Sequence, residues 1–223
     1  MFSLFLKLFK IFFEIDFFDG CIIMELLIFT KQTEGTEKHM EYKMTIAGCE
    51  RALPLCPLND ELMIGAFVIF GDAELTVACA RDLLQKAPAY DYLLTAEAKG
   101  IPLIHEMARQ HGDKKYFVAR KKPKLYMTGV FEADVRSITT EGEQKLYLDI
   151  ADAEMMKGKN ILLVDDVIST GQSLAALEKL VEKTGANICG RMAILAEGDA
   201  QNRPDIIYLE KLPLFNRKGE IVG

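Results

Sequence analysis

The sequence has few cysteines and none in a recurrent spacing. Five cysteines are scattered along 223 residues, with no pair at C-x-x-C spacing: Cys21, Cys49, Cys56, Cys79 and Cys189. An odd, scattered set speaks against a zinc knuckle and against a disulfide framework. A reducing cytoplasm is the compartment that fits this pattern best, so we expect a cytoplasmic protein.

The chain also lacks an excess of positive charge. Lysine and arginine number 27 against 33 aspartates and glutamates, which gives a formal net charge of −6. Proteins that bind nucleic acids normally present a basic face, so we expect no nucleic-acid partner. Basic clusters in this chain must therefore be local features.

No stretch of about 20 apolar residues is free of charges, although residues 1–39 are rich in phenylalanine. Charged side chains interrupt every such window: Lys7, Lys10, Glu14, Asp16, Asp19 and Glu25. We therefore expect no stable membrane insertion, and we find no cleavage site typical of a secretory signal. Residues 1–43 are interpreted as an extension outside the fold, with Met40 or Met44 as the true initiator. A peripheral membrane anchor is the alternative.

The remaining residues, 44–223, are expected to form one globular domain. Half of the chain is hydrophobic and 27% is charged, which is sufficient for a substantial core. Residues 44–223 contain no internal repeat and no low-complexity tract. A repeat architecture is therefore not indicated.

An apolar run that leads into two acids and a glycine turn is the central motif. Residues 161–164 are all apolar, Asp165 and Asp166 follow, and Gly171 precedes the apolar periodicity of a helix. This order is typical of a buried parallel strand that passes through a loop into a helix N-terminus. Unpaired backbone N–H groups and the helix dipole make such a turn a site for phosphate. Glycine at position 171 lets the backbone approach the anion closely.

The two acids suit a different chemical group. A carboxylate accepts hydrogen bonds and does not donate them, so the pair suits two neighbouring sugar hydroxyls or a metal held between them. A Walker phosphate loop is excluded, because that motif requires a lysine directly after its last glycine and Gln172 follows Gly171 here.

The order of strand, two acids, short loop, Thr-Gly and small hydroxyl residue resembles the phosphoribosyl-pyrophosphate (PRPP) signature of type I phosphoribosyltransferases. The resemblance implies that Asp165 and Asp166 bind the ribose hydroxyls of PRPP. It assigns the 5'-phosphate to the loop that follows, which comprises Val167, Ile168, Ser169, Thr170, Gly171, Gln172 and Ser173. An ordinary strand-turn-helix with a capping hydroxyl is the alternative interpretation.

Two further loops carry the resemblance. The segment Glu-Ala-Lys-Gly at 97–100 is similar to the Glu-Ala-Arg-Gly loop of adenine phosphoribosyltransferases, which implies pyrophosphate contacts from Ala98, Lys99 and Gly100. Lysine acts as a point charge and cannot make arginine's planar two-pronged contact. The family's basic pyrophosphate loop, which sometimes acts across a dimer interface, is matched after the strand 116–119 by Arg120, Lys121 and Lys124. A homodimer is expected by the same resemblance.

The segments that cover the site are less distinctive. Alternation within 127–150 predicts an antiparallel arm, which in the family is a flexible loop over the transition state. The carboxylate of the adenine enzymes has no counterpart at 137–140, so Glu141 is a candidate catalytic residue of the arm. Residues 44–70 predict a small, irregular hood over the base, in which Phe67 and Phe70 either stack on the base or belong to the core.

The resemblance predicts an α/β fold: a Rossmann-like parallel sheet flanked by helices, with a small hood and a flexible antiparallel arm. The expected function is a purine phosphoribosyltransferase of purine salvage, which forms a nucleoside monophosphate and pyrophosphate from PRPP and a purine. Mg²⁺ is expected to be bound through PRPP and not by a direct protein ligand. The alternatives are a xanthine phosphoribosyltransferase or a non-catalytic regulator that binds PRPP.

The motifs disagree about the base. Glu-Ala-Lys-Gly favours adenine, whereas the arm resembles xanthine enzymes better. Xanthine enzymes carry a lysine in the region occupied here by residues 197–199, and hypoxanthine-guanine enzymes carry an acid at the position of Ser169. Adenine is therefore the favoured base.

Overall fold

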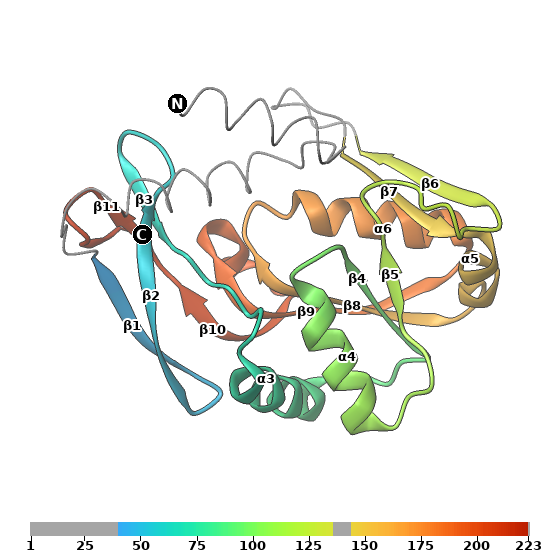
Figure 1. The fold of residues 1–223 in the computed structure, drawn as a ribbon, viewed down its shortest axis with the longest axis horizontal. Coiled ribbons are helices and arrows are strands. Elements are labelled where there is room, and N and C mark those ends of the chain that lie inside the picture. Colours follow the sequence, from blue (N-terminus) through green and yellow to red (C-terminus); the bar gives the residue numbers. More distant parts are fainter. Residues whose placement is uncertain (1–39, 136–143, 223) are drawn as a thin grey trace, which may run out of the picture. The chain divides into compact units, whose positions relative to one another are not determined.

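The computed structural model describes residues 40–135 and 144–222 (Figure 1). These residues belong to one compact unit that begins at Met40. Its first strand, β1 (Glu41–Ile46), starts shortly before the predicted domain boundary at Met44. Within the part of the chain that the structure describes, no helix is long and apolar enough to cross a membrane.

We expect a chain that begins at Met40 to fold and to retain the full protein's activity. The described strands, helices and apolar core all belong to the unit that begins at that residue. Thermal unfolding and activity of the truncated and full-length proteins test this prediction. Precipitation of the truncated chain, or loss of its activity, would contradict it.

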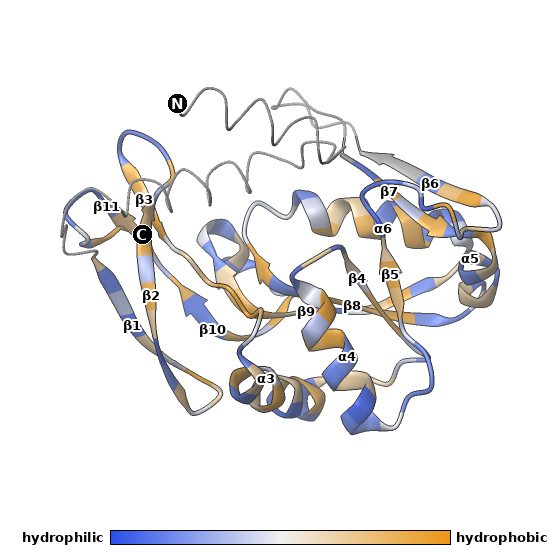
Figure 2. Ribbon diagram, in the orientation of Figure 1, coloured by the Kyte–Doolittle hydropathy of each residue, from blue (hydrophilic) through white to orange (hydrophobic). Residues whose placement is uncertain are grey.

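A five-stranded parallel sheet forms the centre of the unit, in the order β10-β9-β8-β4-β5. Its strands are β4 (Tyr92–Ala96), β5 (Phe117–Ala119), β8 (Asn160–Ile168), β9 (Asn187–Glu197) and β10 (Ile207–Leu212). β4, β5 and the first half of β8 are mainly apolar, as expected where helices cover both faces of a sheet, whereas the edge strand β10 carries the exposed Glu210 and Lys211 and is largely blue in Figure 2. The predicted parallel α/β fold is confirmed.

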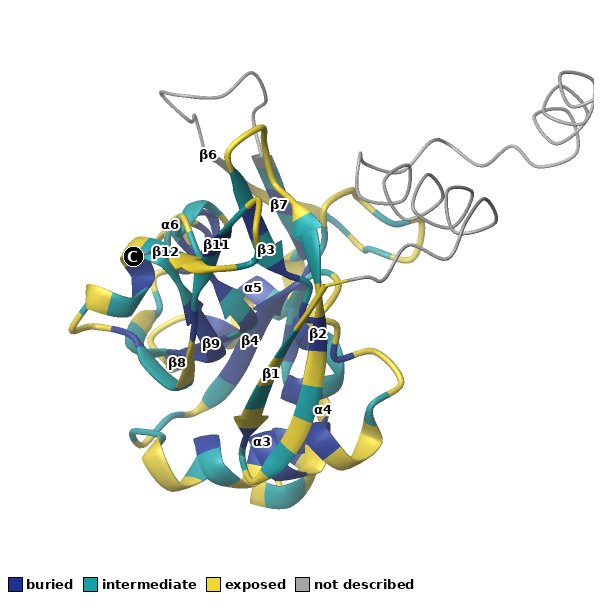
Figure 3. Ribbon diagram, turned by 90° about the vertical axis from the view of Figure 1, so that its left-hand side faces the viewer, coloured by how far each residue is buried: buried dark blue, intermediate teal, exposed yellow. Residues whose placement is uncertain are grey.

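The helices lie in two layers (Figure 1). One face of the sheet carries α3 (Ala73–Lys86) and α4 (Gly100–His111), and the other carries α6 (Gln172–Thr184) and α5 (Ile150–Met156). The alternation of β8 matches these layers, because Ile161 and Leu163 pack with α6 whereas Leu162 and Val164 pack with α3 and α4. Figure 3 shows the central strands buried and the outer sides of α3 and α4 exposed.

Single residues define the ends of three helices. Asp72 caps α3 by accepting a hydrogen bond from the N–H of Leu75 at 3.1 Å. Gly112 and Gly185 end α4 and α6 in the left-handed conformation, with φ of +87° and +75°. Both caps place glycine where other residues are strained.

The predicted antiparallel arm is also present. It consists of β6 (Val130–Val135) and β7 (Gln144–Asp149), which pair from Val130 opposite Asp149 to Val135 opposite Gln144. The tip between these strands, which includes Glu141, lies outside the described residues. The arm packs on the same side of the sheet as α6 (Figure 1).

The prediction of an irregular hood was wrong. Residues 41–65 form an antiparallel sheet with the end of the described chain, in the order β1-β2-β3-β11-β12. The other members are β2 (Cys49–Pro57), β3 (Leu62–Gly65), β11 (Leu214–Asn216) and β12 (Ile221–Val222). Pro54 does not interrupt β2, because it lies where β2 stops pairing with β1 and starts pairing with β3. We call these five strands the hood sheet.

Candidate functional site

The strand order reverses between β4 and β8. From β4 the chain continues to β5 on one side, and it later returns to β8 on the other side. The carboxyl ends of parallel strands at such a reversal border the crevice in which α/β proteins bind ligands. Pairing between β4 and β8 extends only to Leu94 opposite Leu163, so the last residues of β8 have an open edge toward this crevice.

The acid pair lies within β8 and not at its end, which corrects the sequence prediction. Val167 and Ile168 continue the strand, paired with Leu195 and Ala196 of β9. The predicted phosphate loop is therefore shorter than expected, because its first two residues belong to the sheet. The turn itself comprises residues 169–171.

Asp166 is buried near the carboxyl end of β8, beside a lysine. It is only 3% exposed, and its Oδ2 lies 3.2 Å from Nζ of Lys99. The same oxygen accepts no hydrogen bond of favourable geometry from the described residues. Asp165 accepts a hydrogen bond from the N–H of Asp166 at 2.9 Å. The site thus contains acceptor atoms that a ligand's hydroxyl groups could satisfy.

The two carboxyl groups of the pair affect each other's ionisation. Burial, and the charge of Asp166 next to it, raise the pKa of the Asp165 carboxyl well above its usual range, and the charge of Lys99 opposes this increase. One carboxyl of an unliganded pair therefore holds its proton at a pH at which exposed aspartates are ionised.

This pKa makes the stability of the ligand-free protein dependent on pH. A carboxyl whose pKa is raised by folding stabilises the fold at low pH, and that stability is lost as the pH rises above about 4 toward the raised pKa. We expect the free energy of unfolding to decrease from pH 5 to pH 8 less steeply in Asp165→Asn than in the wild type. Denaturant titrations at several pH values measure the difference, and parallel curves would contradict the prediction.

Gly100 is required by the contact between α4 and the sheet. A Cβ atom at this position would lie 2.1 Å from Oγ1 of Thr95 and 3.4 Å from Oδ1 of Asp165. The absence of a side chain lets the N-terminus of α4 pack directly on β4 and β8, which brings Lys99 to the acid pair. No side chain caps α4. The N–H of Ile101 donates to the carbonyl of Ala98 at 3.1 Å and Pro102 has no N–H, so among the first three residues of the helix only the N–H of Gly100 remains available to an anion.

Glu97 gathers the basic loop that follows β5, a role that we did not predict. Nε and Nη2 of Arg120 both donate to its carboxylate at 3.1 Å. The N–H of Lys121 also donates to it at 3.1 Å, and Nζ of Lys124 lies at 3.8 Å. The backbone of Arg120 in turn pairs with Tyr147 of the arm. Glu97 thus joins the two predicted pyrophosphate loops, one of which also contacts the arm.

The turn before α6 has the geometry of a phosphate site. Gly171 is the N-cap residue with φ of +76°, and no side chain caps the helix. The first N–H groups of α6 are consequently free to bind an anion. Residues 169–173 contain no lysine, arginine or histidine, so the turn itself supplies no full positive charge.

The predicted residues of the base site fall into different environments. Phe67 is 5% exposed and belongs to the core beside α3 and α4, so it cannot stack on a base in this structure. Phe70 is 50% exposed at the turn before α3. Glu197 ends β9 and is half-buried, which raises the pKa of its carboxyl, while the charge of Lys99 lowers it.

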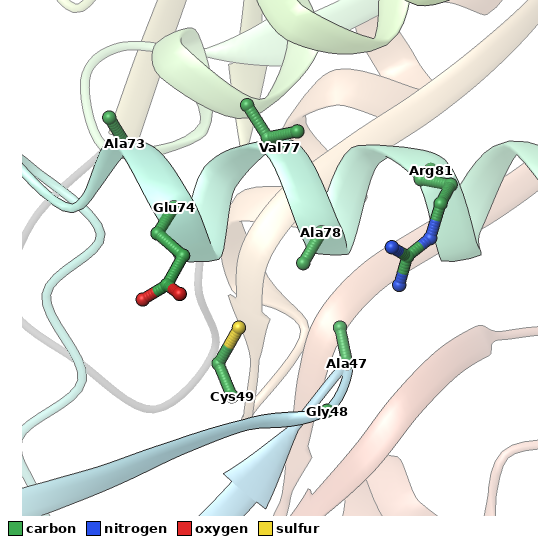
Figure 4. A pocket seen from close by; sticks show the side chains of 8 residues that line it. All are labelled: Ala47, Gly48, Cys49, Ala73, Glu74, Val77, Ala78 and Arg81. Atoms are coloured by element: carbon green, nitrogen blue, oxygen red, sulfur yellow. The ribbon is translucent and has the colours of Figure 1, made fainter.

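A hollow on the outside of α3 lies apart from these loops (Figure 4). It is formed by the turn between β1 and β2 and by one flank of α3, with Cys49, Glu74 and Arg81 among its lining residues. None of the predicted PRPP residues lines it. The chemistry of the acid pair and the two anion sites, and not this hollow, defines the candidate site.

The acid pair provides oxygen atoms of the kind that Mg²⁺ prefers. Within residues 40–135 and 144–222, no group of three or more histidines, cysteines, aspartates or glutamates is arranged to hold a metal ion. Two adjacent carboxylates, one with an unsatisfied oxygen, nevertheless provide oxygen atoms for a cation that is bound mainly by a phosphorylated ligand. The residues present therefore fit Mg²⁺ that arrives with a ligand.

Comparison with known families decides the assignment. The model of the phosphoribosyl transferase domain matches residues 73–216, which include the acid pair and all three loops. The chain belongs to this family. Its predicted resemblance to type I phosphoribosyltransferases is thereby confirmed.

Two relatives of this phosphoribosyltransferase chain carry different substrate names. A hypoxanthine/guanine phosphoribosyltransferase of Methanothermococcus okinawensis is 33% identical over 134 residues, which are 57% of this chain and 69% of the relative. A xanthine phosphoribosyltransferase of Lactobacillus acidophilus is 31% identical over 107 residues, 48% of this chain and 55% of that protein. Neither name supports the predicted preference for adenine.

Solved structures share the fold of this phosphoribosyltransferase domain. The adenine phosphoribosyltransferase of Thermoanaerobacter pseudethanolicus aligns with a TM-score of 0.53 at 22% identity, covering 64% of this chain and 84% of that one. The enzyme of Saccharomyces cerevisiae aligns with a TM-score of 0.51 at 20% identity, covering 76% and 92%. At these identities the likeness concerns the fold alone.

Proposed function

We propose that this protein is a purine phosphoribosyltransferase that transfers the 5-phosphoribosyl group of PRPP to a purine, with adenine as the favoured base. The observation that carries the proposal is an acid pair, with Asp166 buried and Asp165 half-buried, close to the N-termini of two helices that no side chain caps. PRPP has the matching groups, because its ribose hydroxyls lie between a 5'-phosphate and a pyrophosphate. The products are a nucleoside monophosphate and pyrophosphate.

Each part of the crevice binds one part of PRPP in this proposal. Asp165 and Asp166 accept hydrogen bonds from the ribose hydroxyls, which satisfies the buried oxygen of Asp166. The turn before α6 binds the 5'-phosphate, and the N-terminus of α4 binds pyrophosphate together with Lys99. Arg120, Lys121 and Lys124 supply further positive charge, held at the crevice by Glu97.

The reaction requires orientation and charge stabilisation more than a nucleophile. The bond from C1 of the ribose to pyrophosphate breaks as a purine nitrogen forms the new bond to C1, so positive charge develops on the sugar and negative charge on the leaving group. Mg²⁺ bound with PRPP would neutralise part of the pyrophosphate charge. In this proposal Lys99 and the basic loop stabilise the departing pyrophosphate, and the arm excludes water from the reacting sugar.

Glu197 supports the choice of adenine. It ends β9 one residue after Ala196, which pairs with Ile168 at the edge of the phosphate turn. A half-buried carboxylate there accepts hydrogen bonds from an amino group and repels the oxygen of an oxopurine. The same position lacks the lysine that would favour xanthine. Adenine, with an amino group and no oxygen, is therefore the proposed base.

The test of this function is product formation. Full-length protein is incubated with PRPP, Mg²⁺ and, separately, adenine, hypoxanthine, guanine or xanthine, and the nucleotide is identified by mass spectrometry. We expect the adenine nucleotide to form fastest and pyrophosphate to be released in equal amount. A faster reaction with xanthine would favour the second candidate, to which the Lactobacillus relative points. PRPP binding without turnover of any base would indicate a non-catalytic regulator.

We also propose a homodimer. Leu125 is fully exposed and Tyr126 is 67% exposed, directly after the basic residues of the loop that follows β5. Two large apolar side chains at a site's edge favour coverage by a second copy. Light scattering of the purified protein gives the mass in solution, and a monomer at micromolar concentration would contradict the proposal.

A further inference from the structure

Arg203 lies against the turn that begins α6, although it belongs to a different part of the chain. It follows η1 (Gly198–Asn202), the short 3-10 helix after β9, and its N–H donates to the carbonyl of Ala200 at 3.3 Å. A Cβ atom built on Gly171 would lie 3.1 Å from Nη1 of Arg203. The guanidinium therefore borders the glycine that caps α6.

Other charged residues fix the orientation of this guanidinium. Nε and Nη2 of Arg203 donate to the carboxylate of Asp205 at 3.0 and 2.7 Å. Asp205 also lies 3.5 Å from Nε of Arg191, and Arg191 pairs with Glu178 of α6. Asp205 uses only two of the three nitrogens, and Nη1 makes no hydrogen bond within the described part of the chain. The free nitrogen is the one next to Gly171.

The turn needs a positive charge from outside itself. A phosphate monoester carries a charge of about −1.5 to −2 at neutral pH, whereas a helix N-terminus supplies roughly half a positive charge. Residues 169–173 contain no cationic side chain. Arg203 places a cationic side chain beside the unpaired backbone N–H groups of the turn. An anion is the partner that would accept hydrogen bonds from the two N–H groups of its Nη1.

We infer that Arg203 is a substrate-binding residue whose Nη1 donates hydrogen bonds to the 5'-phosphate, and that Asp205 positions it. The inference rests on the proposed function, because the ligand is the 5'-phosphate of PRPP. It adds to the turn a residue that lies beyond β9 and that the sequence motif does not contain.

Calorimetry with two separate probes tests the inference. Ribose 5-phosphate carries the 5'-phosphate alone, and pyrophosphate with Mg²⁺ occupies the other anion site. We expect Arg203→Gln to bind ribose 5-phosphate about 10- to 100-fold more weakly than the wild type, with the affinity for pyrophosphate unchanged. Arg203→Lys should recover part of the loss. Asp205→Asn leaves the positive charge of Arg203 in place and removes the carboxylate that orients it. The loss of affinity for ribose 5-phosphate should therefore be smaller than in Arg203→Gln.

A pH comparison separates direct contact from a structural role. Phosphate monoesters gain their second charge near pH 6, so the wild type should bind ribose 5-phosphate more tightly at pH 7.5 than at pH 5. Arg203→Gln should show a smaller gain, since it lacks the cation that recognises that charge. Asp205, Arg191 and Glu178 border Arg203 and are present in both proteins, as is the acid pair.

The outcomes are distinct. An unchanged affinity for ribose 5-phosphate in Arg203→Gln, an equal loss for pyrophosphate, or the same loss at both pH values would overturn the inference. Failure of the wild type to bind either probe or PRPP would instead refute the proposed function, and the inference with it.

Discussion

Gly171→Val should abolish the binding of PRPP, with a loss of at least about 100-fold in affinity. Glycine at this position has φ of +76°, a conformation that costs a β-branched residue most. The new Cβ would also lie 3.1 Å from Nη1 of Arg203. Either the side chain obstructs the phosphate or the turn changes shape, and both remove the aligned N–H groups. Calorimetry with PRPP and Mg²⁺ measures the effect.

The same helix provides a matched control. Gly185 ends α6 with φ of +75°, and the nearest atom to a Cβ there is Cγ of Lys157 at 3.8 Å. Gly185→Val therefore has a similar backbone cost but lies far along the helix from the turn. It should lower the melting temperature and leave PRPP affinity unchanged. If a folded Gly171→Val bound PRPP as tightly as the wild type, the phosphate site would have to lie elsewhere.

A milder change in the turn should weaken PRPP binding less than Gly171→Val does. Thr170→Val removes one hydroxyl at nearly constant shape, which should cost about 1.5–3 kcal/mol of PRPP binding, or a factor of roughly 10 to 150. A smaller loss than in Gly171→Val is expected because the backbone N–H groups stay in place.

Asp166→Asn should lower the reaction rate by at least about 100-fold and raise the stability of the ligand-free protein. The amide cannot accept hydrogen bonds from ribose hydroxyls as an anion does. It also removes a charge next to Asp165 and replaces a buried oxygen that lacks a hydrogen bond of favourable geometry. The expected gain is about 1 kcal/mol, or roughly 2–4 °C in melting temperature. Lys99 loses its partner at little cost because its side chain is 46% exposed.

Glu106 serves as the control for the predicted increase in stability. It is also a buried carboxyl, but Arg109 donates two hydrogen bonds to it and lowers its pKa to about 2. Glu106→Gln should therefore reduce stability and leave the reaction rate intact. Steady-state kinetics and thermal unfolding of both variants are the measurements. Normal kinetics in Asp166→Asn would show that the pair does not bind the sugar.

Patterns of neighbouring residues correctly predicted individual strands and helices. The apolar run before Asp165 predicted the central strand, and the apolar periodicity after Gly171 predicted α6, because each signal involves neighbours in sequence. The hood sheet was missed because its pairing joins Met63 to Phe215, which no local pattern reveals. Phe67 could not be assigned, since an apolar aromatic fits a core and a base site equally.

In the candidate site, too, the residues of one local motif were predictable, whereas residues that act through distant contacts were not. The acid pair and Gly171 lie in one continuous motif, so the sequence predicted them together as parts of one site. The roles of Glu97 and Arg203 depend on contacts across the crevice, with Arg120 in one case and Gly171 in the other. Glu97 lay within the Glu-Ala-Lys-Gly loop, so a signal existed for it. Arg203 lay in a polar loop without a recognisable pattern.

The hood sheet has a consequence for the order of folding during synthesis. The parallel sheet is complete once β10 has left the ribosome, but β3 still lacks its partner β11. Its outer edge then exposes unpaired backbone groups, which can pair with strands of other nascent chains. Because Phe215 must find Met63 across most of the domain, this closure has a high contact order and comes late. The synthesis of β11 therefore completes a sheet whose first strands were translated well before it.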